Sequence, residues 1–308
     1  MRIVPANDAS IAEAVERLRR GLLVAFPTET VYGLGARVWD AAAVRRVFEA
    51  KGRPEGHPLI AHVLGEDDAR TLAREWPEAG ERVARAFWPG PITVVVPKVD
   101  AVPNEVTGRL DSVGIRAPAH PVARALLAAL GDPIVAPSAN RHQGISPTTA
   151  PHVRVSLGDA DVLVLDGGEC ERGIESTVLD VRVHPARILR PGPIGRDALR
   201  AAGIDVEIGS TSASEGARRS PGMSPRHYAP RAMLLTASTD AELKTLAGVH
   251  KAVVLELPDD PESAAHDLYA RLFELDEAGV AVAVVKMPPD TDAWHAVRDR
   301  LRRASTRK

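Results

Sequence analysis

Residues 207–231 are rich in serine, glycine, alanine and proline, and they divide this chain of 308 residues into two unlike parts. Before them, strand-length and helix-length segments follow each other irregularly, whereas after them the two kinds alternate. Because stretches of this composition connect packed units, the pattern predicts two domains. We expect a large domain at 1–206, a linker at 207–231 and a small domain at 232–308.

The first part combines strands and helices in no regular order. Apolar runs of strand length lie at 22–26, 59–63, 92–96, 112–116, 134–136, 161–165, 177–181 and 187–189. Helical patterns lie at 11–20, 41–50, 66–74, 78–87, 121–130 and 196–202. This mixture predicts an α/β domain built on a mixed sheet rather than a simple doubly wound one.

The last part alternates strictly. Strand-like runs at 233–237, 252–257 and 280–287 are each followed by a helical pattern, at 239–247, 263–278 and 292–304. This β-α-β-α-β-α order predicts a three-stranded parallel sheet with helical crossovers. At roughly 75 residues the unit is near the lower limit for independent stability, so we expect it to dock on the first domain.

Composition excludes several kinds of site and location. The formal charge is −2, so no overall field favours nucleic acid or an anionic membrane. The single cysteine, Cys170, excludes an intramolecular disulfide and a cysteine-built zinc site. The N-terminus has no apolar signal core, and the apolar runs are too short to span a membrane. These features predict a soluble cytoplasmic protein without membrane contact.

Polar residues gather where the apolar runs end, which is where α/β folds place ligands. In F-P-T-E-T-V-Y-G-L-G-A, residues 26–36, the strand leads into Thr30 and two glycines, although the same stretch could be a loop between a strand and a helix. In K-G-R-P, Lys51 and Arg53 are held close together, and a bound anion would relieve their repulsion. Lys51 could instead bind the last carbonyls of the preceding helix.

Further polar residues follow other strands. Arg116 precedes a proline and can fork onto a carboxylate or lie on the surface. Ser138 and Asn140, in A-P-S-A-N, could serve a ligand or cap their own loop, and without a G-x-S-x-G elbow Ser138 is a poor nucleophile. Ser176 in E-S-T and Arg190 before Pro-Gly complete the set. The inventory suits a small anion and a polyphosphate, with no protein-built metal site.

Taken in order, these blocks resemble the YrdC/Sua5 family over essentially the whole chain. The matching stretches are F-P-T-E-T-V-Y-G-L-G-A, K-G-R-P, F-W-P-G-P-I-T, A-P-S-A-N and E-S-T. The segment S-P-G-M-S-P-R-H-Y-A-P, residues 220–230, and the alternating tail resemble the two-domain Sua5 form. The resemblance implies a twisted mixed sheet with a large cleft and a small Rossmann-like, three-layer C-terminal domain.

The resemblance also implies an activity. A Sua5-type enzyme is a nucleotidyltransferase, L-threonylcarbamoyladenylate synthase, which joins L-threonine, bicarbonate or CO2, and ATP, and releases pyrophosphate. Mg²⁺ is expected on the ATP phosphates, held mainly by the nucleotide and water. The t6A transfer machinery then moves the threonylcarbamoyl group to tRNA.

Residue by residue, the resemblance implies three groups. The polar tetrad of the cleft is matched by Lys51, Arg53, Ser138 and Asn140. The threonine pocket is matched by Thr30, His62, Arg116, Ala136 through its backbone, and Ser176. The ATP pocket is matched by Arg53, His57, Ser112, Ser138, Ser146, Arg190 and Tyr228. Two positions depart from the family, because His57 and Asp299 stand where asparagine is common.

We interpret residues 220–230 as a lid. Their three prolines restrict the unfolded conformations, which lowers the entropy lost when the segment closes. Tyr228 can cover or hydrogen-bond the nucleotide, and Arg226 or His227 can meet phosphate. A passive, stiff tether between domains is the alternative.

Two other functions are open alternatives. One is a module that binds double-stranded RNA or tRNA without turnover, through the basic tail R-D-R-L-R-R-A-S-T-R-K. The negative net charge and the low aromatic content of 4% argue against it. The other is carbamoyl transfer for hydrogenase maturation, and the single cysteine argues against the zinc-finger parts of that system.

Overall fold

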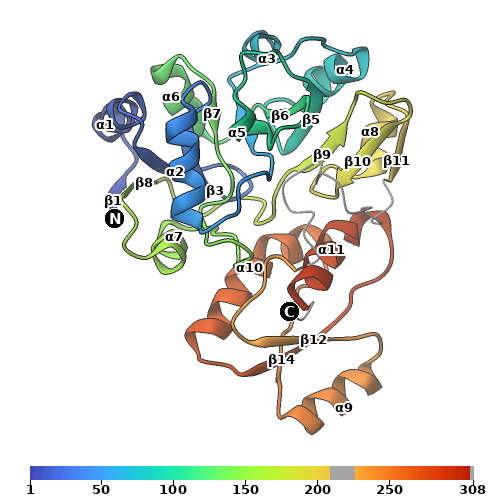
Figure 1. The fold of residues 1–308 in the computed structure, drawn as a ribbon. Coiled ribbons are helices and arrows are strands. Elements are labelled where there is room, and N and C mark those ends of the chain that lie inside the picture. The colour runs from blue at the N-terminus through green and yellow to red at the C-terminus, as the bar shows by residue number, and fades with distance from the viewer. Residues whose placement is uncertain (209–225, 306–308) are drawn as a thin grey trace.

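Two sheets organise the structure, a computed structural model that describes residues 1–208 and 226–305 (Figure 1). The first sheet takes its strands from residues 2–208 and the second from 233–286. We call the part built on each sheet the N-terminal and the C-terminal domain. The predicted fold class, a mixed α/β fold with a second small sheet domain, is confirmed.

Within the described residues, eleven strands form the large sheet, in the order β1-β8-β2-β3-β7-β4-β6-β5-β9-β10-β11. They are β1 (Arg2–Pro5), β2 (Leu23–Pro27), β3 (Tyr32–Arg37), β4 (Ile60–His62), β5 (Ile92–Pro97), β6 (Ser112–Arg116), β7 (Ile134–Val135), β8 (Val162–Asp166), β9 (Thr177–Asp180), β10 (Ala186–Arg190) and β11 (Val206–Ile208). Parallel pairs such as β4 with β6 alternate with antiparallel pairs such as β2 with β3, so the sheet is mixed.

Helices pack on both faces of this sheet. They are α1 (Asp8–Arg19), α2 (Ala41–Lys51), α3 (Glu66–Leu72), α4 (Glu78–Phe87), α5 (Asn104–Thr107), α6 (Pro121–Leu130), α7 (Ala150–Leu157) and α8 (Arg196–Ala201). Strand β2 shows how both faces are buried, because successive side chains of a strand point to opposite sides. Leu23 and Ala25 join the core formed with α2, whereas Val24 and Phe26 join the core formed with α1 and α6.

The glycine-rich stretch after β2 is a strand, and not the loop to a helix that its composition also allows. Strand β3 pairs antiparallel with β2, so residues 28–31 form the turn of a buried hairpin. Glycine is needed for close packing there. A Cβ on Gly33 would lie 2.9 Å from the Cβ of Ala136, and a Cβ on Gly35 would lie 2.8 Å from the ring of Phe26.

The C-terminal domain has the predicted parallel sheet, with its strands in the order β12-β14-β13. Its elements are β12 (Met233–Ala237), α9 (Asp240–His250), β13 (Val253–Val254), α10 (Pro261–Glu277), β14 (Val282–Lys286), a 3-10 turn η1 (Asp292–Trp294) and α11 (His295–Ser305). Helix α9 lies on one side of the sheet, and α10 and α11 lie on the other (Figure 1). None of the helices in the described ranges is long and apolar enough to cross a membrane.

The C-terminal domain packs against the N-terminal domain through α10 and α11. Leu268 and Phe273 of α10 share an apolar cluster with Ile145 and Ile174 of the N-terminal domain. The ring of Phe273 also stacks on His152 at 4.1 Å. The docking expected for so small a unit is therefore present.

The end of β10 lies directly on the start of β9, and Gly192 marks the contact. A Cβ at this position would lie 2.2 Å from the backbone nitrogen of Thr177 and 2.6 Å from the carbonyl carbon of Ser176. Backbone atoms cannot move aside as the end of a flexible side chain can. Only glycine therefore fits at position 192.

We predict that Gly192→Ala lowers the free energy of unfolding by about 1–3 kcal/mol, because two backbone segments must separate to admit the methyl group. The control is Gly248→Ala in α9, where a Cβ meets nothing within 4 Å. Alanine there should add up to about 1 kcal/mol through its higher helix propensity. Urea unfolding of both variants is the measurement, and a Gly192→Ala protein as stable as the wild type would contradict the prediction.

Candidate functional site

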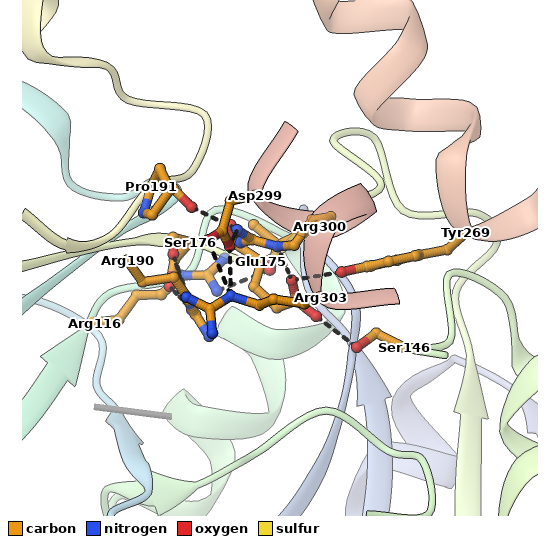
Figure 2. Close-up of polar contacts among 11 residues, drawn as sticks. Arg116, Ser146, Glu175, Ser176, Arg190, Pro191, Tyr269, Asp299, Arg300 and Arg303 are labelled. Atoms are coloured by element: carbon orange, nitrogen blue, oxygen red, sulfur yellow. Dashed lines mark hydrogen bonds and ion pairs between the residues drawn. The ribbon is translucent and has the colours of Figure 1, made fainter. Parts of the chain in front are cut away.

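Polar residues from several strand ends meet at one edge of the large sheet. Strands β4 and β6 run in parallel, and His62 pairs with Arg116 at their ends. Ala136 follows β7 beside them and donates its backbone N–H to the Ile60 carbonyl. On the other side of β6, Ser176 precedes β9 and Arg190 ends β10. Helix α11 of the C-terminal domain lies against this edge (Figure 2).

A cavity of about 50 Å³ lies between these residues. All five residues matched to the threonine pocket line it, namely Thr30, His62, Arg116, Ala136 and Ser176. Four residues of the ATP group line it as well, namely Arg53, Ser138, Arg190 and Tyr228. The volume has room for only a few water molecules. The protein's own side chains therefore nearly fill the space between the expected binding residues.

Lys51 lies outside the lining of this cavity. Its buried ammonium donates to the backbone carbonyls of Ser138 and Asn140, the latter at 2.6 Å. Burial, together with the nearby charge of Arg53, lowers the pKa of Lys51 well below its usual value. The lysine thus holds the loop that follows β7, and not the carbonyls at the end of its own helix.

Asn140 also shapes that loop. Its side-chain amide nitrogen donates to the carbonyls of Arg141 and Gly144, both at 2.8 Å. This is the loop-capping arrangement that the sequence left open for Asn140. Its carboxamide oxygen lies 3.4 Å from the Lys51 ammonium. Lys51 and Asn140 therefore shape the backbone that carries Ser138 to the cavity.

Three residues of the ATP group lie around the cavity rather than in its wall. Ser112 begins β6 and Arg116 ends it, which places them about 13 Å apart along the strand. Ser146 donates to the carboxylate of Glu175 at 2.5 Å. The ring of His57 lies 5.6 Å from that of His142, which lies 6.5 Å from the ring of His227. A row of imidazoles thus leads from His57 to the cavity wall.

Arg116 is buried at the end of β6 and does not lie on the surface. Its Nη1 donates to the Thr30 hydroxyl at 2.8 Å, its Nε donates to the Gly90 carbonyl at 3.2 Å, and its Nη2 lies 2.7 Å from the Glu29 carboxylate. Burial would raise the pKa of Glu29, but the charge and hydrogen bond of Arg116 outweigh it and lower the pKa. A guanidinium has five N–H donors, so at least two are left for a ligand.

Three buried polar atoms in the cavity wall have no hydrogen-bond partner among the described residues. They are Nδ1 of His62, Nδ1 of His227 and the hydroxyl of Tyr228. Each such group destabilises a folded protein by about 1–3 kcal/mol. Because buried polar groups are nearly always paired, three unpaired ones around one cavity indicate a site for a polar ligand.

Tyr228 is held in a strained backbone conformation. Its φ of 61° lies in the left-handed region, which is unfavourable for a tyrosine by roughly 1–2 kcal/mol. Its ring lies 4.1 Å from His227 and 5.5 Å from Tyr269, and the Arg300 guanidinium lies 5.2 Å from it. Of the expected lid, residues 220–225 lie outside the described residues. Packing thus fixes Tyr228, which lies near the end of the expected lid, against the cavity.

Glu175 accepts hydrogen bonds from both domains, and it is not among the site residues that the sequence predicted. Its Oε1 accepts from Ser146, and its Oε2 accepts from the hydroxyl of Tyr269 at 2.9 Å and from Nε of Arg300 at 3.0 Å (Figure 2). Burial would raise the pKa of Glu175, but the charges of Arg300 and Arg190 lower it to about 2. The E-S-T stretch pointed to its neighbour Ser176, but nothing nearby in the sequence pointed to its partners.

Arg190 and Ser176 are joined directly. The Arg190 guanidinium donates from Nη2 to the Ser176 carbonyl at 2.9 Å and to its hydroxyl at 3.0 Å. The Ser176 hydroxyl also lies 2.8 Å from that of Thr93. In the described part of the chain, no group of three or more His, Cys, Asp or Glu side chains is arranged to hold a metal ion. The lining of the cavity combines arginines, hydroxyls, imidazoles and the carboxylate of Glu175.

We predict that His62 makes stability depend on pH. Burial, with the charge of Arg116, lowers its pKa from 6.5 to about 3. The unfolded chain therefore binds a proton below pH 6.5 that the folded chain does not bind until about pH 3. The free energy of unfolding therefore decreases as the pH is lowered from 6.5 to about 3. The slope is up to about 1.4 kcal/mol per pH unit. Urea unfolding at pH 6.5 and 5 should show a smaller loss for His62→Gln than for wild type. A His62 ring that titrates near pH 6.5 by NMR would contradict this.

The chain matches two family models and resembles named relatives over nearly its whole length. The family model Sua5_yciO_yrdC, described as "Telomere recombination", matches residues 16–192. The model Sua5_C, described as "Threonylcarbamoyl-AMP synthase, C-terminal domain", matches residues 194–306. The threonylcarbamoyl-AMP synthase of Pyrococcus abyssi is 40% identical over 311 residues, which cover 94% of this chain and 92% of the relative. That of Bacillus subtilis is 37% identical over 325 residues, covering 97% and 94%.

A solved structure agrees with these relatives. The crystal structure of P. abyssi Sua5 complexed with L-threonine matches with a TM-score of 0.92 and 37% identity, covering 99% of this chain and 96% of that one. The match thus extends over both domains, as do the two family models together. The family that the motifs indicated is confirmed, and the chain belongs to the YrdC/Sua5 family in its two-domain Sua5 form.

Proposed function

We propose that this chain is a threonylcarbamoyl-AMP synthase, which joins L-threonine, bicarbonate or CO2, and ATP, and releases pyrophosphate. The cavity at the sheet edge carries the proposal, because it brings together unpaired polar atoms on the residues matched to threonine and to ATP. Relatives that match nearly the whole chain bear this name, and a similar solved structure contains L-threonine.

The wall around Arg116 suits an amino acid. Its planar fork would take the threonine carboxylate with the donors that Thr30, Gly90 and Glu29 leave over. His62 stays neutral at physiological pH and would hydrogen-bond the ligand through its unpaired Nδ1. Ala136 already donates its N–H to Ile60, so it would contribute its carbonyl oxygen.

The chemistry requires fixed positive charge beside the nucleotide. The threonine amine adds to CO2, loses a proton and becomes a carbamate. A carbamate oxygen then attacks the α-phosphorus of ATP, the bond from that phosphorus to the bridging oxygen breaks, and pyrophosphate leaves with the electron pair. Arg53 and Arg190 line the cavity and would stabilise the charge that builds up on the phosphoryl oxygens. ATP would enter as its Mg²⁺ complex, with the ion held by phosphates and water.

The reactants need more room than the structure offers. A cavity of about 50 Å³ cannot hold threonine and ATP, so the residues closing it must move when substrates enter. His227 and Tyr228, at the end of the segment 207–231, are the residues of the expected lid that close it. We propose that residues 226–230, the described part of the expected lid, move aside for substrates and then shelter the carbamate from water.

The RNA-binding alternative loses support from the ion pairs of three arginines in the described part of its basic tail. Arg300 is fully buried, and Arg298 and Arg303 form ion pairs with Asp290 and Asp299. A side chain held in this way contributes little to a phosphate-binding surface. Downstream transfer to tRNA would instead depend on partner proteins that take up the adenylate.

We predict that the protein forms a threonyl-carbamoyl adenylate from ATP, Mg²⁺, bicarbonate and L-threonine. Mass spectrometry of the product and release of pyrophosphate are the measurements. Serine and glycine, incubated in parallel, are the controls for the substrate. Equal product from either would contradict the threonine assignment, and a salt-dependent shift of tRNA with no nucleotide turnover would favour the RNA-binding alternative.

We predict that Tyr228→Phe separates binding from stability. Because its hydroxyl is buried without a partner, removing it should leave the melting temperature unchanged or raise it. The KM for ATP should rise by about tenfold if that hydroxyl bonds the nucleotide. The matched control is Tyr269→Phe, which removes a bond to Glu175 and should lower the free energy of unfolding by about 1–3 kcal/mol. An unchanged KM in Tyr228→Phe would remove Tyr228 from the ATP site.

A further inference from the structure

Helix α11 of the C-terminal domain places an arginine inside the N-terminal domain. The Arg300 side chain is 0% exposed. Its Nε donates to Glu175 Oε2 at 3.0 Å, and its Nη1 donates to the Pro191 carbonyl at 2.8 Å (Figure 2). Nη1 also bonds Asp299 of its own helix at 3.0 Å. One guanidinium therefore joins two separate segments of the other domain.

Both of these segments carry residues of the candidate site. Glu175 immediately precedes Ser176, and Pro191 immediately follows Arg190. Arg190 and Ser176 are themselves joined by hydrogen bonds and line the cavity. Arg300 thus bonds the two residues next to this pair, whose own members line the cavity. A displacement of Glu175 or Pro191 would move that pair.

The carboxylate of Glu175 also joins the loop after β7 to helix α10. It accepts from Ser146 in the loop after β7 and from Tyr269 in α10. Without Arg300, the buried carboxylate would keep these two neutral donors and the nearby charge of Arg190, but it would lose its hydrogen-bonded ionic partner. A buried charge that loses its ionic partner destabilises its surroundings strongly, so Glu175 would turn away or take up a proton.

We propose that Arg300 is a positioning residue for the reaction: from the C-terminal domain it fixes Glu175 and Pro191, and so holds Ser176 and Arg190 in place for the substrates. This inference rests on the proposed synthase function. It gives the C-terminal domain a part in catalysis through the geometry of the site, without contact to a substrate. Lysine cannot replace Arg300, because a single ammonium lacks the planar fork that reaches both partners.

The first test is kinetic. Arg300→Met should lower kcat for adenylate formation by about 100-fold, the effect of a misplacement of about 1 Å, while the KM values for threonine and ATP change by less than about tenfold. Arg300→Lys should restore the melting temperature and leave kcat low. The matched control is Arg298→Met on the same helix, whose bonds to Pro288 and Asp290 stay within the C-terminal domain. It should keep the wild-type kcat.

A double variant separates positioning from folding. Glu175→Gln with Arg300→Met removes both members of the ion pair, so the melting temperature should recover part of the way toward that of the wild type while kcat stays low. If kcat recovers together with the melting temperature, Arg300 is a structural counter-ion only. A wild-type kcat in Arg300→Met would overturn the proposal as well.

Hydrogen exchange distinguishes failure of this inference from failure of the proposed function. The wild-type protein is assayed first, and the absence of any adenylate would overturn the synthase function. The amides of residues 175–178 and of Gly192 should exchange at least about tenfold faster in Arg300→Met than in Arg298→Met, whatever the reaction is. Equal exchange rates in the two variants would show that Arg300 does not hold these segments.

Discussion

The carboxylate of Glu175, buried and charged between the two sheets, sets the arrangement of the residues around it. A charge removed from water is stable in a protein only when oriented donors replace the water. Here the donors are Ser146, Tyr269 and Arg300, which come from one loop and two helices. The position of the C-terminal domain is therefore tied to the E-S-T stretch at the start of β9.

The wall of the cavity beside this carboxylate carries polar atoms that lack hydrogen-bond partners within the described ranges. His62, His227 and Tyr228 each present a buried polar atom without a partner among the described residues, and Tyr228 also has a left-handed backbone. A chain selected for stability alone would fill this space with apolar side chains. Departures from local rules of this kind gather at functional sites, where a ligand offsets what the empty site lacks. Glu175 has all its partners and holds the site together, whereas the residues with unpaired polar atoms form the surface that would bind a ligand.

The fold followed from the sequence wherever apolar runs have the right length. Strands β2, β4, β5 and β6 are such runs, and strict alternation predicted the parallel sheet of the C-terminal domain. Strand β3 was not predicted, because its glycines suit a loop equally well until Phe26 and Ala136 pack against them. For Lys51 the sequence left open an anion or the last carbonyls of its own helix, and in the structure its ammonium is buried against carbonyls 87 and 89 residues away in sequence.

The sequence by itself determined which polar residues end the strands, and strand ends of one sheet meet at its edge. The resemblance to the family then grouped five residues at or next to these ends as a threonine pocket. The sequence also determined the two-domain order and the family, through short blocks whose spacing is local. Only the tertiary structure decided that Glu175 meets Tyr269 and Arg300, which lie 94 and 125 residues further along the chain. The physical reason is that a charge pair between distant segments depends on how two domains dock, and no local pattern of residues encodes that docking.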